Sequence, residues 1–129
     1  MKSLTLFLIL FIIKSSVSKS NLDNYSIDLF IKTLKDEKLF EIIQSIKWFY
    51  GQDVAIISCE ELNKNHCGNC KRVVIEYMPK NPGGLTPQSE ITILKILMEK
   101  FPKEKANLIR KNIITEAKKR NIKIKINFT

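Results

Sequence analysis

The sequence predicts a small, mostly α-helical domain, and three observations support this prediction. Apolar residues recur at three- and four-residue spacing in several segments, as they do on one face of an α-helix. Residues 79–87, PKNPGGLTP, form a clear linker, because prolines and glycines at this density continue neither a helix nor a central strand. The chain has 129 residues, enough for one modest core.

The first 18 residues are typical of a signal peptide. Lys2 gives a positive start, residues 4–13 are almost entirely apolar, and Ser18 is a small residue suited to signal peptidase. The apolar run is about half of the roughly 20 residues that a membrane-spanning helix requires. We therefore expect residues 1–18 to be removed and residues 19–129 to form a single secreted domain without a membrane span.

Two helices are predicted before the middle of the chain. The first covers residues 27–34 and follows Ser26, a residue type that caps helix starts. The second covers residues 37–50 behind Asp36, with one apolar stripe, and Gly51 is a natural end.

Two further helices are predicted after the linker. Thr86, followed by a proline, indicates the start of a helix over residues 88–101. Pro102 interrupts it, and a last helix over residues 103–120 carries apolar residues on one stripe and cations around the rest.

Three segments leave an α+β fold open. Residues 54–58 and 72–77 are rich in β-branched side chains, and residues 122–128 alternate apolar and polar residues as a half-buried strand does. If these three segments pair, the domain contains a small sheet.

Basic side chains concentrate at the C-terminal end. The chain has 22 Lys and Arg against 13 Asp and Glu, and residues 95–129 alone hold eleven basic and three acidic side chains. A segment of this kind can meet an anionic surface or polymer. Lys118, Lys119 and Arg120 are the candidate basic patch.

The three cysteines after the signal peptide admit three interpretations. A disulfide is favoured, either between Cys67 and Cys70 or between Cys59 and one of these two. A zinc site could use Cys59, His66, Cys67 and Cys70, although adjacent His66 and Cys67 strain a shared tetrahedral geometry. We expect no bound metal and no other cofactor.

The third interpretation is thiol–disulfide exchange at Cys67-Gly68-Asn69-Cys70. A cysteine at a helix N-terminus beside cations would have a lowered pKa and attack a disulfide. Residues 66–77, HCGNCKRVVIEY, locally resemble the thioredoxin and disulfide-isomerase motif. Those domains place a strand directly before the motif, and here Cys59 and a polar loop intervene.

A longer resemblance, over residues 23–108, is to the insect chemosensory protein (OS-D) family. Its landmarks occur here in order as Asp23-Asn24…Asp28, Asp36-Glu37-Lys38-Leu39-Phe40, Gly51, Cys67-Gly68-Asn69-Cys70, and Phe101-Pro102-Lys103-Glu104 with Leu108. The family's first cysteine pair is absent, and Ile46 stands where one member would be.

This resemblance implies a helical shell around an apolar channel that carries small hydrophobic ligands. The amphipathic helices could leave such a pocket. The candidate lining residues are Phe40, Ile43, Leu94, Leu97 and Met98.

The motif content favours a non-enzymatic function, because the chain has one histidine, no Gly-rich phosphate loop and no nucleophile elbow. The leading prediction is a small secreted binding protein that carries small apolar ligands. One alternative is a secreted interaction protein, an effector or inhibitor that binds an extracellular macromolecule through the basic C-terminal helix, and the other is a thiol–disulfide oxidoreductase. Asn24, in Asn24-Tyr25-Ser26, is a candidate glycosylation site.

Overall fold

Helices account for nearly all of the regular structure in residues 19–80 and 92–124, the part of the chain that this computed structural model describes. The side chains of residues 19–24 and 65–67 lie outside the description. In chain order the elements are α2 (Lys19–Asp36), α3 (Leu39–Tyr50), α4 (Gln52–Leu62), the 3₁₀-helical η1 (Lys64–Asn69), α5 (Cys70–Arg72), the π-helical η2 (Val73–Tyr77), α6 (Ile93–Met98) and α7 (Lys103–Lys119).

The mostly α-helical fold is confirmed, and the α+β alternative is wrong for the segments that the structure describes. Residues 54–58 lie inside α4, and residues 72–77 lie in α5 and η2. Residues 122–124 form no strand, and the rest of the C-terminal segment lies outside the description. The reason for the ambiguity in α4 is burial: residues 54–59 are all buried, and a helix in the middle of a protein is apolar all round.

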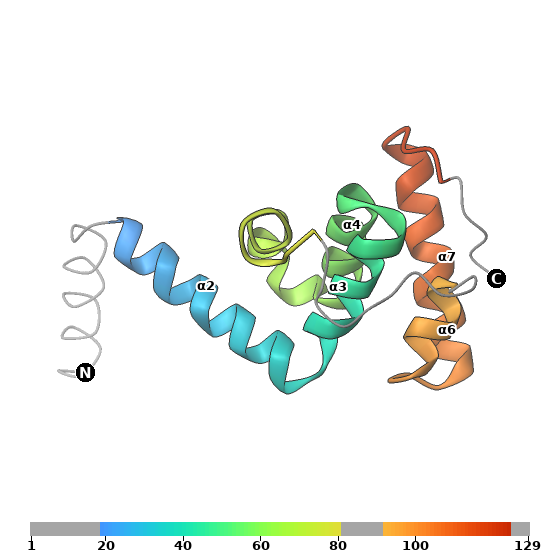
Figure 1. Cartoon of the computed structure of the whole chain (residues 1–129), viewed down its shortest axis with the longest axis horizontal. Coiled ribbons are helices and arrows are strands. Elements are labelled where there is room, and N and C mark those ends of the chain that lie inside the picture. The colour runs from blue at the N-terminus through green and yellow to red at the C-terminus, as the bar shows by residue number, and fades with distance from the viewer. Residues whose placement is uncertain (1–18, 81–91, 125–129) are drawn as a thin grey trace, which may run out of the picture.

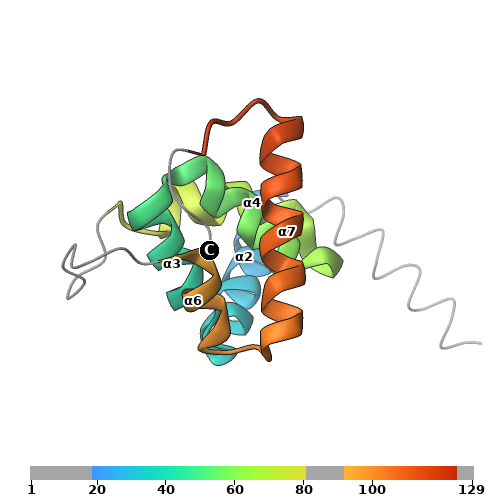
Figure 2. The same ribbon diagram turned by 90° about the vertical axis from the view of Figure 1, so that its right-hand side faces the viewer.

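Helices α3 and α4 lie between α2 on one side and α6 with α7 on the other (Figure 1). After a quarter turn of the view, α7 runs lengthwise beside α6, with α4 behind it (Figure 2). Helix α7 therefore covers one side of the bundle, and its other side faces outward.

One hydrophobic core joins these helices. Helices α2, α3, α4, α6 and α7 all contribute to it, as does the continuous turn of α5 and η2. The largest fully buried side chains are Ile27, Leu34, Ile43, Ile46, Ile57, Ile93, Leu97, Ile113, Val73, Val74, Cys59 and Cys70.

The first two helices meet at a sharp corner. Helix α2 begins at Lys19, well before the predicted start, so Ser26 lies within the helix and does not cap it. Asp36 is the last residue of α2, and Lys38, with a left-handed φ of 63°, precedes α3 instead. Gly51 ends α3 as expected, and its φ of 100° suits a residue without a Cβ atom.

The last two helices are joined at Pro102. Helix α6 is shorter than the predicted span of residues 88–101, and the predicted start around Thr86 lies outside the described residues. Thr92 caps α6, because its Oγ1 accepts a hydrogen bond of 3.1 Å from the backbone N–H of Lys95. Helix α7 agrees with the predicted span to within one residue.

Lys47 of α3 closes the end of η2. Its Nζ donates hydrogen bonds of 2.6 Å to the carbonyl oxygens of both Val74 and Met78. Carbonyls at a helix end have no partner within the helix, so this buried ammonium supplies partners that are otherwise missing there.

Candidate functional site

Helix α7 has two contrasting sides. The inner side is made of small and branched apolar residues at helical spacing, which are Ala106, Ile109, Ile113 and Ala117, all buried. This stripe packs on α4 and α6. The opposite side is exposed and carries most of the helix's charges.

Four exposed lysines define what we call the basic face: Lys111, Lys118 and Lys119 on α7, and Lys123 just after it. Lys111 and Lys118 lie two turns apart on the same side of the helix, roughly 10 Å along its axis. Within residues 25–64, 68–80 and 92–124, the ammonium groups of these lysines make no ion pair. They are therefore available to an anionic partner.

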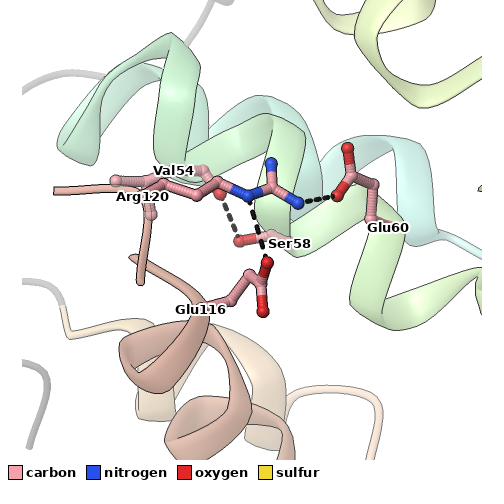
Figure 3. A network of polar contacts seen from close by, with 5 residues as sticks. All are labelled: Val54, Ser58, Glu60, Glu116 and Arg120. Atoms are coloured by element: carbon pink, nitrogen blue, oxygen red, sulfur yellow. Dashed lines mark hydrogen bonds and ion pairs between the residues drawn. The ribbon is translucent and has the colours of Figure 1, made fainter. Parts of the chain in front are cut away.

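Arg120, the third residue of the predicted basic patch, has a different role. Its Nη2 lies 2.6 Å from Glu60 Oε2 on α4, and its Nε lies 3.2 Å from Glu116 Oε1 on α7 (Figure 3). The hydrogen bond to the Glu60 carboxylate is the main cause of a raised Arg120 pKa. Lys118 and Lys119 point to solvent, whereas Arg120 ties α7 to α4.

A second polar contact joins the same two helices. Asn112 Nδ2 donates a hydrogen bond of 2.6 Å to Glu61 Oε1, and Lys64 Nζ pairs with the same oxygen at 3.1 Å. Neighbouring acids of α4, Glu60 and Glu61, thus both bind α7. They add to the buried stripe, which determines how α7 lies on the bundle and so which side it presents to solvent.

The acidic side chains of α7 leave the basic face largely unopposed. Glu104 is exposed near the start of the helix, and Glu116 is paired with Arg120. Arg110 does not belong to the face, since its Nε is buried and, among the described residues, hydrogen-bonds to no protein group. Positive charge therefore increases toward the C-terminal end of α7, where it also complements the helix dipole.

The cysteines lie elsewhere, in the core between α4 and α5. Cys59 on α4 and Cys70 at the start of α5 are buried, and both are free thiols in this structure. No bond therefore joins Cys70 to Cys67 here; the Cys67 side chain lies outside the description, and the predicted pairing stays a prediction. A hydrogen bond with the Cys70 thiol is the main cause of a raised Cys59 pKa, and burial is the next.

The surroundings of the Cys-Gly-Asn-Cys segment differ from a thioredoxin-type site. Helix α4 and η1 precede Cys70 where that motif requires a strand. As for zinc, no three His, Cys, Asp or Glu residues cluster for a metal within the described part of the chain, and the side chains of His66 and Cys67 are not included in it.

The predicted ligand-lining residues fall into three groups. Ile43 of α3 and Leu97 of α6 are completely buried in the core. Phe40 and Leu94 are partly buried and pack against it, whereas Met98 lies at the surface with 43% of its area exposed. The set therefore runs from the core to the surface along two contacting helices, α3 and α6.

Asn24, the candidate glycosylation site, lies within α2, and its side chain is outside the description. Among the described helices, none combines the length and the apolar character that crossing a membrane requires.

The sequence matches no protein-family model, and searches of curated proteins and of solved structures found no significant relative. The described part of the chain is a small, mostly α-helical domain with one hydrophobic core and a basic face on its outer helix α7.

Proposed function

We propose that this protein is a small, secreted, non-enzymatic binding protein that docks onto an anionic extracellular polymer through the basic face of α7. The observation that supports the proposal is the exposure of Lys111, Lys118, Lys119 and Lys123 without ion-pair partners among the described residues. Lysines held this way can exchange their counterions for sulfate or phosphate groups.

The fixed orientation of α7 supports the same proposal. The buried inner stripe keeps one side of α7 on the bundle, the contacts of Glu60 and Glu61 with Arg120 and Asn112 add to it, and the lysines stay outside. A lysine-rich side on a rigid helix can contact several charges of one polymer together, and each contact releases counterions.

The test is binding to heparin, measured by titration calorimetry at increasing salt. With three or four charge contacts, the affinity is expected to fall on the order of 50-fold between about 50 and 200 mM salt. The variant Lys111→Gln/Lys118→Gln/Lys119→Gln should lose most of the affinity and flatten the salt dependence.

A matched control separates a binding face from net charge. Lys32, Lys71 and Lys95 are exposed on other helices, so Lys32→Gln/Lys71→Gln/Lys95→Gln removes the same charge. It should retain most of the affinity. Equal loss in both variants, or no salt dependence in the wild type, would contradict the proposal.

A carrier of small apolar ligands is the second proposal, and one observation favours it. Phe40 and Leu94 leave part of their surface exposed next to the buried Ile43 and Leu97 at the contact of α3 and α6. Such a carrier should bind a fluorescent apolar probe saturably at micromolar protein concentration. The variant Leu94→Asp should abolish that binding, and a wild type that binds no probe argues against a carrier.

A further inference from the structure

Cys59 and Cys70 meet inside the core although they belong to different helices. Cys59 lies in α4 and Cys70 begins α5, and both side chains are 0% exposed. Their thiols are hydrogen-bonding partners, and Asn63 Nδ2 lies 3.9 Å from Cys59 Sγ. Both cysteines are free in this structure, so a disulfide, with its bond length of about 2 Å, requires the two sulfur atoms to approach each other further where α4 and α5 are in contact.

We propose that Cys59 and Cys70 form a disulfide bond that joins α4 to α5, and that Cys67 is the cysteine outside this pair. The proposal does not depend on the function of α7. It replaces the local Cys67–Cys70 loop with a longer one, and a longer loop restrains the unfolded chain more.

The reaction is a two-electron oxidation by an external disulfide, such as oxidised glutathione or the disulfide of an oxidoreductase. A thiolate of the pair attacks the external disulfide, forms a mixed disulfide and releases one external thiol. The second cysteine then attacks its partner's sulfur, which forms the Cys59–Cys70 bond and releases the second external thiol. Two protons and two electrons leave the pair, and the external disulfide is reduced to two thiols.

The surroundings of the pair decide when this reaction occurs. Because the thiolate is the attacking species, the raised pKa of Cys59 slows exchange in the folded, reduced protein. The bond therefore forms before the core closes. Once formed, it is shielded from reductants, since neither side chain reaches solvent.

Peptide mapping tests the proposal. The full chain is refolded in a glutathione redox buffer, its remaining thiols are alkylated in denaturant without reduction, and trypsin is added. Cleavage after Lys47, Lys64 and Lys71 separates Cys59, in peptide 48–64, from Cys67 and Cys70, in peptide 65–71. The expected product is a cross-link between these peptides, with the alkyl group on Cys67. Fragmentation at Gly68 and Asn69 locates that group within the peptide.

Two variants provide the controls. Cys67→Ser should keep the cross-link, and Cys59→Ser should lose it. In Cys67→Ser, the oxidised protein should melt roughly 10 °C above the reduced one. If Cys59→Ser fails to fold, the fragmentation of the wild-type peptides still identifies the pair.

Three results would overturn the proposal. An internal bond within peptide 65–71 with Cys59 alkylated would show the Cys67–Cys70 pair. Alkylation of all three cysteines would show that no bond forms. A cross-link that disappears in Cys67→Ser would show that Cys59 pairs with Cys67.

Discussion

The ammonium of Lys47 donates a hydrogen bond of 2.6 Å to the carbonyl oxygen of Val74, across 27 residues of sequence. It makes a second bond of the same length to Met78. Lys47 is 7% exposed, so α3 buries a charged group in order to satisfy the end of η2. The segment that carries Cys70 is therefore held at both ends, by the core at its start and by Lys47 at its finish.

Replacing Lys47 should destabilise the protein. In Lys47→Met the carbonyls of Val74 and Met78 lose their partner while remaining close to the core, and we expect a loss of about 2 kcal/mol in the free energy of unfolding. Urea unfolding followed by circular dichroism measures it. Lys32→Met, at an exposed position of α2, should stay within about 0.5 kcal/mol of the wild type. Equal stability of both variants would mean that the Lys47 hydrogen bonds contribute nothing.

The pair Arg120–Glu60 should couple α7 to α4 only modestly. Both side chains are partly exposed, and exposed ion pairs contribute about 0.2–1 kcal/mol. A double-mutant cycle with Arg120→Gln and Glu60→Gln should give a coupling energy in that range, decreasing as salt is added. A cycle with Lys119→Gln in place of Arg120→Gln should give none. A coupling energy that salt does not change would contradict the exposed geometry.

Periodicity was sufficient to predict α3 and α7. Each has one apolar stripe. Gly51 marks where α3 ends, and Pro102 marks where α7 begins. The beginning of α2 was missed because residues 19–26, KSNLDNYS, hold few apolar side chains and so show no helical stripe. Helix α4 stayed ambiguous because burial on all sides removes the alternation between apolar and polar faces that identifies a helix.

The candidate site was predictable only in part. The lysines of the basic face follow from composition, because charged side chains on an amphipathic helix face solvent. The role of Arg120 could not be predicted, since its partner Glu60 lies 60 residues earlier and meets it only in the folded chain. The same holds for Cys59 and Cys70, whose contact depends on how α5 packs on α4.

The inner stripe of α7 should carry most of its stabilisation. Ile113 is completely buried, and Ile113→Ala should cost about 2–5 kcal/mol through lost apolar contact and the cavity that remains. Leu108, on the same helix, is 58% exposed, so Leu108→Ala should change the free energy of unfolding by less than about 0.5 kcal/mol. Denaturant unfolding compares the two variants. Similar costs would show that α7 does not pack as described.

The stability of the protein should fall in strong alkali because of Tyr50. Burial raises the pKa of Tyr50 from 10.0 to about 12, and a hydrogen bond with the backbone of Ile93 opposes this in part. The folded state therefore holds the phenolic proton more tightly than the unfolded state does. Its contribution is complete below pH 10 and is lost as the pH rises through 12.

The titration of Lys47 changes the stability of the protein in the opposite direction, and it does so at lower pH. Burial, and next the charge of Lys80, lower its pKa, so stability increases with pH up to the unfolded value of 10.5 and no further. Unfolding should therefore be compared between about pH 10.5 and pH 12, where the Lys47 effect has ended and the raised pKa of Cys59 acts equally on the wild type and on a Tyr50 variant. Tyr50→Phe should lose less stability than the wild type over this interval. The same loss in both proteins would show that the Tyr50 hydroxyl is not shielded from water at the contact with α6.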